Sequence, residues 1–313
     1  MNIAIILPAF NEEHTIAKVI TSFHKELPKA KIVVVNNAST DNTFNEATKT
    51  FAKLDIGGTI INEARQGKGF AVRAAFTQID ADYYVLCDAD DTYPANSVKD
   101  LLNLAYEGAD LVVGNRLSSG SYKKQNNRRY HTFGNRLINF IVNCLFSNID
   151  KIKDVMSGYR VFSRKFVKNY PILVPGFQLE TDMTLHALDK RFVVREMEVT
   201  YQNRPKESFS KLNTISDGLK VLFCIARVFR YYRPLFFFSI LSLIFLITGF
   251  LSAIPVLRDW ILYSYIYHVP LAILASSLEL VAILTLLAGF ILDSLSHQNK
   301  FMYEHTLLNL KKD

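Results

Sequence analysis

The stretch YYVLCDADDTYPA, residues 83–95, joins a short apolar run to three carboxylates. Residues 83–86 have the composition of a buried strand, and Asp88, Asp90 and Asp91 come almost directly after it. Two interpretations are open for this run. Alternate acids behind a strand can hold a magnesium or manganese ion that keeps substrate phosphates as its other ligands. The same acids can instead cap a helix near residues 96–105.

The chain around this run alternates β-rich apolar runs with helical patterns over residues 1 to about 110. The expected strands are residues 3–7, 32–35, 59–61, 83–86 and 111–113. Such alternation predicts an α/β fold with a mainly parallel sheet. Ligands bind such sheets at the carboxyl ends of the strands, and charged residues follow four of the five runs. Residues 120–233 have a less regular pattern.

A second candidate is the segment RQGKGFAVRAAF, residues 65–76. It places Arg65 and Lys68 among glycines at the start of a helix, where backbone N–H groups can bind a phosphate. The segment is neither a Walker loop nor GxGxxG, so an ordinary glycine-rich helix start stays open. Further arginines add cations suited to phosphate oxygens, namely Arg116, Arg128, Arg129, Arg136, Arg160 and Arg204.

Composition narrows the function classes. The net charge of +7 and pI of 9.1 favour an anionic partner, which can be nucleic acid, phospholipid or a phosphorylated substrate. The three cysteines show no disulfide or zinc spacing, which is typical of a reducing compartment. No GxSxG, HExxH or Cys/His pair occurs, which argues against covalent hydrolase chemistry.

Two apolar stretches near the C-terminus predict membrane spans. Residues 235–254 are 20 residues without a charge, which as a helix would cover about 30 Å. Residues 269–292 are similar but carry Glu279. A mid-membrane carboxylate is costly, and Glu279 is interpreted either as a structural group bonded to the neighbouring helix or a second subunit, or as a functional one.

Basic residues give the expected orientation. Four precede the first span, Arg258 alone lies between the spans, and three follow the second. By the positive-inside rule, both termini face the cytoplasm and residues 255–268 form a short external loop. We therefore expect a catalytic domain over residues 1–213, an amphipathic juxtamembrane helix over 214–233, a two-helix anchor over 234–294 and a cytoplasmic tail over 295–313.

The order of the motifs resembles glycosyltransferase family 2, most closely the polyprenyl-phosphate sugar transferases related to dolichol-phosphate mannose synthase. The matching stretches, spread over residues 3 to about 238, are ILPAFNEE, VVVNNASTDNT, RQGKGFAVRAAF, DADDTYPA, DLVVGNRL, FGNRL, DVMSGYRVFSR, GFQLETDM, RPKESFSKLNT and YRPLFFF. The resemblance implies a GT-A fold. It also implies transfer of a hexose, with inversion, from a nucleotide-diphosphate sugar to undecaprenyl or dolichyl phosphate at the cytoplasmic face.

The resemblance assigns roles to residues by position. Asp88 and Asp90 match the catalytic pair around Mg²⁺ or Mn²⁺ and the diphosphate, and Asp91 lies beside them. The implied donor-site residues are Pro8, Phe10, Glu12, Asn37, Lys68, Arg204 and Lys211. The implied acceptor-phosphate residues are Arg116, Arg128 and Thr132, while Glu180 and Asp182 would help to hold the sugar. Ser157, Gly158, Tyr159 and Arg160 match a motif near the active site.

One departure concerns residues 36–43, NNASTDNT, where the family pattern is DDGSTDGT. Two acids have become amides, and Asn can hydrogen-bond a base but lacks the charge. Two competing functions stay open: transfer to a lipid hydroxyl, with Asp182 or Glu180 as base, and a catalytically inactive membrane-anchored scaffold that binds nucleotide sugar. Membrane spans and a donor-type site account for the positive charge without nucleic acid. Self-association and a downstream flippase stay open as partners.

Overall fold

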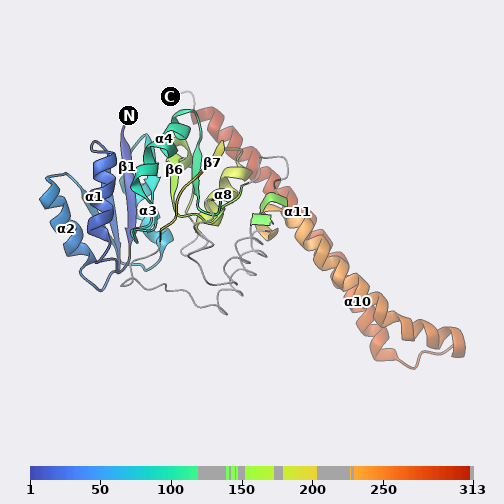
Figure 1. Cartoon of the computed structure of the whole chain (residues 1–313). Coiled ribbons are helices and arrows are strands. Elements are labelled where there is room, and N and C mark those ends of the chain that lie inside the picture. The colour runs from blue at the N-terminus through green and yellow to red at the C-terminus, as the bar shows by residue number, and fades with distance from the viewer. Residues whose placement is uncertain are drawn as a thin grey trace. The chain divides into compact units, whose positions relative to one another are not determined.

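The computed structural model describes residues 1–118, 139–140, 142–144, 146, 152–172, 179–202, 226 and 229–310. The chain divides into two compact units, Met1–Gly218 and Leu219–Asp313, and each is considered by itself. Figure 1 shows the elements of both units along the chain.

The first half of unit 1 alternates strands and helices, as the sequence predicts. The strands are β1 (Ile3–Ala9), β2 (Lys31–Asn37), β3 (Thr59–Glu63), β4 (Tyr83–Leu86) and β5 (Leu111–Asn115). The helices between them are α1 (Ile16–Glu26), α2 (Thr43–Leu54), α3 (Lys68–Gln78) and α4 (Val98–Tyr106), and a single 3₁₀ turn, η1 (Ala95–Ser97), precedes α4. All five predicted strands are confirmed, and four of them extend beyond the predicted ends.

The second half of unit 1 adds two strands that the sequence pattern missed. They are β6 (Arg160–Ser163) and β7 (Val194–Glu198), accompanied by α7 (Arg164–Asn169) and α8 (Leu179–Asp189). β6 has polar residues at both ends, and β7 is only partly buried and carries three charged residues. Neither segment has the continuous apolar run that marks the central strands, so hydrophobic pattern alone gives them little signal.

The seven strands form one sheet in the order β3-β2-β1-β4-β6-β5-β7. Strands β1 to β4 are parallel to one another, and β7 is parallel to β5, whereas β6 runs antiparallel between β4 and β5. Leu86 at the carboxyl end of β4 pairs with Arg160 at the start of β6. The residues just before β6 are therefore placed beside the acids that follow β4.

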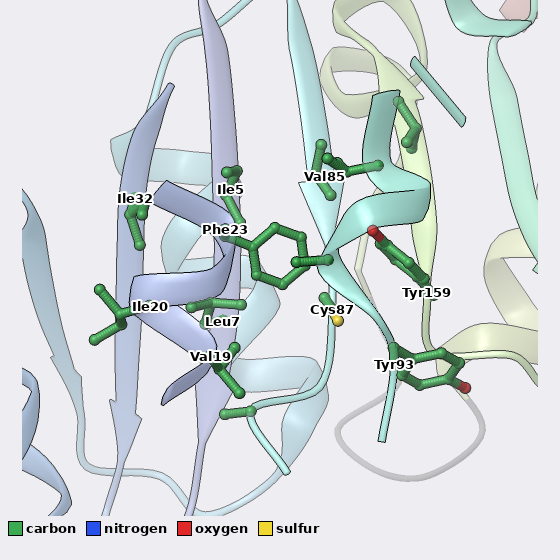
Figure 2. Packing of buried hydrophobic residues seen from close by; sticks show 14 of the residues in the cluster. Ile5, Leu7, Val19, Ile20, Phe23, Ile32, Val85, Cys87, Tyr93 and Tyr159 are labelled. Carbon is green, nitrogen blue, oxygen red and sulfur yellow. The ribbon is translucent and has the colours of Figure 1, made fainter. Parts of the chain in front are cut away.

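The core lies on both faces of the sheet. On one face, Phe23 of α1 packs among Ile5, Leu7 and Val85, as Figure 2 shows. Its ring meets the edge of Tyr159 at a centroid separation of 6.1 Å. Because burial of a side chain of this size is worth roughly 1.5–3 kcal/mol, this aromatic contact makes a sizeable contribution to the stability of the sheet next to the site.

Unit 2 contains two long apolar helices, α10 (Pro234–Tyr263) and α11 (Val269–Leu310). Both are long and apolar enough to cross a membrane, and only 11% of each apolar window is buried inside the structure. Core helices of soluble proteins are mostly buried, so the exposed apolar side chains of α10 and α11 suggest membrane anchoring.

Small residues bring α10 and α11 together. The Ser242 hydroxyl donates to the carbonyl of Ala282 at 2.7 Å. A Cβ atom on Gly249 would lie 3.2 Å from the Cβ of Leu278, and one on Gly289 would lie 2.8 Å from the Cβ of Phe238. Close backbone approach at small residues is a common way for apolar helices to associate in membranes.

Two details of unit 2 differ from the expected boundaries. α10 continues through Pro255, where a loop was predicted, and ends at Tyr263, because apolar helices accommodate an internal proline. α11 continues to Leu310, so residues 295–310 are helical. Glu279 is exposed, and its Cγ would lie 3.3 Å from a Cβ atom on Gly249 of α10.

Candidate active site

The loops after β1 and β2 interlock at the carboxyl edge of the sheet. Alternate side chains of the STDNT segment accept hydrogen bonds from three successive backbone amides ahead of α1. These bonds join Asn11 N to Ser39 Oγ (3.1 Å), Glu12 N to Thr43 Oγ1 (2.8 Å) and Glu13 N to Asp41 Oδ2 (3.1 Å). The predicted donor residues Pro8, Phe10 and Glu12 are held at this edge, with Pro8 in β1 and the other two in the loop.

Asn37 is buried at the end of β2 and binds the backbone of the next loop. Its amide nitrogen donates to the carbonyl of Glu63 at 3.3 Å and of Arg65 at 2.7 Å, and its oxygen accepts from Gly67 N at 2.8 Å. Both amide hydrogens are thus used within the chain. Asn37 thereby shapes the loop that leads to Lys68, and its expected contact with a base stays a prediction.

Glu63 and Arg65 form an ion pair in the same loop. Arg65 Nη2 lies 2.8 Å from Glu63 Oε2, and the guanidinium lies over the ring of Phe70 at 4.7 Å. Hydrogen bonds from Arg65 lower the pKa of Glu63 to about 2. The pair gives the β3–α3 loop a fixed shape directly before the first residue of α3.

Lys68, the first residue of α3, lies between two carboxylates. Its Nζ is 2.5 Å from Asp88 Oδ1 and 2.5 Å from Glu180 Oε1. Burial by itself would lower the pKa of Lys68, but Asp88 and Glu180 raise it above its usual value. The lysine therefore stays charged and joins the start of α3, the end of β4 and the first turn of α8.

Asp88 is confined on its other side by the turn before β6. A Cβ atom on Gly158 would lie 2.4 Å from Asp88 Oδ2 and 3.2 Å from Lys68 Nζ. The Gly158 N–H donates to Tyr93 Oη at 3.0 Å, and Ser157 Oγ donates to the carbonyl of Gly114. The antiparallel pairing of β6 with β4 thus places Gly158 beside Asp88, where a larger residue would collide with the carboxylate.

The other two acids of the run have separate partners. Asp90 is buried, and its Oδ1 accepts from the hydroxyl of Thr92 at 2.6 Å. Asp91 adopts a positive φ of 58° and pairs with Lys18 of α1 at 2.5 Å. α4 begins at Val98, well after the run, so the interpretation of Asp91 as a helix cap is wrong.

Arg116 lies at the end of β5 and is held by the segment before β6. Its Nε donates to Asp154 Oδ2 at 3.0 Å, and its Nη2 donates to the carbonyl of Met156 at 3.0 Å. Its guanidinium also lies 5.9 Å from the ring of Tyr201. Because the side chain is only 13% exposed, this cation is fixed in one orientation.

Arg160 is fully buried and holds the segment before β6 against α8. Its guanidinium donates to the carbonyls of Ser157 and Val155 and to the hydroxyl of Thr184 in α8. Burial lowers the pKa of Arg160 from its usual value. The three bonds tie the turn that carries Gly158 to the helix that carries Glu180, so Arg160 positions the site without being exposed to a substrate.

Glu180 and Asp182, both on α8, have different partners. Glu180 joins Lys68, whereas Asp182 Oδ2 accepts from the hydroxyl of Tyr170 at 2.7 Å. Two residues apart on an α-helix are rotated by roughly 200°, so the two carboxylates point in different directions. The structure therefore brings only one of them to the Asp88 cluster.

Four predicted site residues, Arg128, Thr132, Arg204 and Lys211, lie outside the described residues, as does most of the expected juxtamembrane helix. In the described part of the chain, no group of three or more His, Cys, Asp or Glu side chains could hold a metal ion. Asp88 and Asp90 offer carboxylate oxygens, which suits a hard cation that takes one or two carboxylates and completes its shell with phosphate oxygens.

Sequence patterns missed several members of the site. Asp154, Thr92, Tyr93 and Lys18 carry no spacing that singles them out, because each becomes a partner only after the sheet has formed. The motif DVMSGYR indicated that Gly158 and Arg160 lie near the active site, but it did not indicate what either residue does there.

Comparisons with known proteins identify the family of the chain. A model of the family described as Glycosyl transferase family 2 matches residues 4–170. Glycosyltransferase AglJ of Haloferax volcanii is 30% identical over 292 residues, which cover 93% of this chain and 92% of that protein. The dolichyl-phosphate hexose transferase of the same organism is 25% identical over 231 residues, covering 72% and 93%. Polyprenol monophosphomannose synthase of Mycolicibacterium smegmatis is 26% identical over 210 residues, covering 64% and 77%.

Among solved structures, glucosyl-3-phosphoglycerate synthase from Mycobacterium tuberculosis, in complex with Mn²⁺, uridine diphosphate and phosphoglyceric acid, superposes with a TM-score of 0.57. It is 21% identical and covers 74% of this chain and 78% of its own, so it bears on the fold alone. The α/β architecture, the mainly parallel sheet and this neighbour confirm the GT-A fold. With the family match over more than half of its length and a 30% identical relative over nearly all of it, the chain belongs to glycosyltransferase family 2 and is a glycosyltransferase.

Proposed function

We propose that this enzyme transfers one hexose, with inversion, from a nucleotide-diphosphate sugar to polyprenyl phosphate, undecaprenyl or dolichyl. The observation that carries the proposal is the position of Asp88 and Asp90 at the carboxyl edge of β4, in a chain that also holds two exposed apolar helices. A lipid-borne acceptor explains why a donor-type site and membrane helices occur together. Relatives named as a dolichyl-phosphate hexose transferase and a polyprenol monophosphomannose synthase support this acceptor.

Asp88 and Asp90 would hold Mg²⁺ or Mn²⁺, which supplies Lewis-acid stabilisation of the departing diphosphate. Structural neighbours of the same fold were crystallised with Mn²⁺ and uridine diphosphate, which is consistent with the use of a divalent metal by enzymes of this fold. The two aspartates, together with diphosphate oxygens, match the ligand preferences of such ions. Lys68 adds a positive charge at the same place, and Glu180 holds that lysine.

The acceptor needs no strong general base. A phosphate monoester has a second pKa near 6, so at neutral pH it is already a largely ionised nucleophile. Arg116, together with Arg128, would orient that phosphate, because planar guanidinium groups suit phosphate oxygens. Direct displacement by the phosphate oxygen would invert the anomeric centre.

The hydroxyl-acceptor alternative requires a working carboxylate base. The observed partners argue against it, since Glu180 pairs with Lys68 and Asp182 accepts from Tyr170. Replacing each acid with its amide separates the two mechanisms. Asp182→Asn should only weaken transfer to polyprenyl phosphate, and a complete loss with an intact fold would favour the hydroxyl acceptor.

The direct test is a screen of radiolabelled nucleotide sugars against membranes that contain the full-length protein and either undecaprenyl or dolichyl phosphate. We expect one sugar to enter a lipid-linked product, and a chelator to abolish the transfer. Asp88→Asn in the same membranes is the matched negative control. Absence of metal-dependent transfer from every nucleotide sugar would contradict the proposal and favour a scaffold that binds without turnover.

The proposed arrangement in the membrane has a catalytic domain over 1–213, a juxtamembrane segment over 214–233 and an anchor over 234–294, with both termini in the cytoplasm. The distribution of basic residues supports it. A cysteine introduced at Ser264, between α10 and α11, should react with a membrane-impermeant maleimide from outside the cell. Labelling only after lysis would reverse this topology. A product made on the inner face would need a flippase, and exposed Glu279 is a candidate contact in a self-associated form.

A further inference from the structure

The position of Lys68 restricts what Asp88 can bind. Its ammonium lies 2.5 Å from Asp88 Oδ1, and Gly158 covers Oδ2 so closely that a Cβ there would come within 2.4 Å. Both oxygens of the carboxylate are therefore confined by the chain itself. A divalent ion that uses Oδ1 would meet the ammonium at contact distance, where two positive charges repel strongly.

Glu180 gives Lys68 a second partner, so that the contact between Lys68 and Asp88 can break and form again. Glu180 holds the same Nζ at 2.5 Å, and its side chain is only 9% exposed. If the ammonium leaves Asp88, it keeps one buried carboxylate partner and does not become an isolated buried charge, which would be costly. The lysine can thus release Asp88 while its own charge stays in the site, where a diphosphate would bind.

We propose that Lys68 occupies the metal position on Asp88 in the free enzyme, and that a divalent cation binds Asp88 only by displacing this ammonium toward Glu180. The inference rests on the metal site of the proposed function. It predicts weak metal binding in the absence of donor and stronger binding when a diphosphate supplies new partners for both the metal and Lys68. The lysine then works as a positioning residue that couples metal binding to donor binding.

The test measures Mn²⁺ alone, without nucleotide, by electron paramagnetic resonance on the full chain in detergent micelles. Lys68→Met removes the ammonium and keeps the apolar stem. We expect its Mn²⁺ dissociation constant to fall about tenfold relative to the unmodified protein, which corresponds to about 1.4 kcal/mol. Adding Asp88→Asn to Lys68→Met should reverse the gain, because Asp88 is the ligand that the substitution uncovers.

Lys18→Met is a matched control. Lys18 pairs with the neighbouring carboxylate Asp91 at the same 2.5 Å, so the change in charge and in side-chain volume is identical. If the gain in Mn²⁺ affinity reflected only the loss of one positive charge, both variants would show it. Displacement from Asp88 predicts the gain in the Lys68 variant and at most a small change, below about twofold, in the Lys18 variant.

The outcomes are distinct. Equal Mn²⁺ affinity in the Lys68→Met and unmodified proteins would overturn the inference and leave the proposed function intact. No Mn²⁺ binding by any variant would overturn both the inference and the metal site. A purely structural tether predicts a lower melting temperature for Lys68→Met without tighter Mn²⁺ binding, which would also overturn it. If circular dichroism shows that Lys68→Met does not fold, Lys68→Gln carries the same test.

Discussion

Gly158 and Asp88 are in contact although 70 residues separate them, and a Cβ atom at position 158 would lie 2.4 Å from Asp88 Oδ2 and 3.0 Å from its Cγ. The contact exists because β6 inserts antiparallel beside β4, with Arg160 paired to Leu86. The turn before β6 therefore fixes the side chain that is central to the proposed metal and donor site.

The first prediction is that Gly158→Ala lowers kcat/KM for sugar transfer by about 100-fold, because displacing a site group by about 1 Å can cost that much. The added methyl group forces Asp88 away from its position beside Lys68. Kinetics on purified full-length protein measure the effect. Gly57→Ala is the control, since a Cβ there meets nothing within 4 Å. Activity of Gly158→Ala at the level of this control would contradict the prediction.

The second prediction concerns the amide that replaces an acid of the family pattern. Asn37→Asp should destabilise the protein by about 2 kcal/mol, because its carboxylate would face the carbonyl oxygens of Glu63 and Arg65 without a hydrogen to donate. Thermal unfolding in detergent gives the measurement. Asn62→Asp, on the exposed end of β3, keeps the oxygen that accepts from Asn36 and should be nearly neutral. A stabilising Asn37→Asp would disprove the assigned role.

The third prediction is a pH dependence from His186, whose ring packs against Tyr170 at 5.1 Å, Phe166 at 5.9 Å and Phe192 at 6.0 Å. Burial lowers the pKa of His186 from 6.5 to about 4. The unfolded chain therefore binds a proton below pH 6.5 that the folded chain does not bind until about pH 4. This contribution to stability is complete above pH 6.5 and is lost as the pH falls.

Between pH 7.5 and pH 5 the loss from this group is on the order of 1–2 kcal/mol. His186→Phe removes the titrating group and keeps an aromatic ring in the cluster. Its melting temperature should fall less between pH 7.5 and pH 5 than that of the unmodified protein. Parallel curves for the two proteins would show that His186 does not titrate in this way.

The fourth prediction concerns the packing of α10 on α11. A Cβ on Gly289 would come within 2.8 Å of the Cβ of Phe238, so Gly289→Ala should separate the helices at a cost of about 1–3 kcal/mol. Disulfide formation between cysteines at Ser242 and Ala282, in membranes, reports on their approach. Gly249→Ala is a milder comparison, with its tightest contact at 3.2 Å, and should slow cross-linking less. Unchanged cross-linking in both variants would refute the predicted packing.

Local sequence determined much of this protein. The apolar runs of β1 to β5 are buried-strand patterns, and each is sufficiently continuous in apolar residues to be recognised without its neighbours. The acids after β4 were placed at the ligand-binding edge, because the carboxyl ends of parallel strands share one edge. The two apolar stretches became α10 and α11, because a helix satisfies the backbone hydrogen bonds of a long apolar segment internally, even with the single acid Glu279 in the second stretch.

Only the tertiary structure decided how those residues combine. β6 has polar residues at both ends and lacks the continuous apolar run of the equally short β4, yet its antiparallel insertion brings Gly158 to Asp88. Lys68 bridges Asp88 and Glu180, residues 20 and 112 positions away, a pairing that its glycine-rich motif did not indicate. Asn37 binds the backbone of the loop between β3 and α3, a contact that its place in the sequence did not indicate. The physical reason is the same for all three contacts. A polar group forms hydrogen bonds with groups that the fold places within about 3 Å of it, however far apart the two residues are in the sequence.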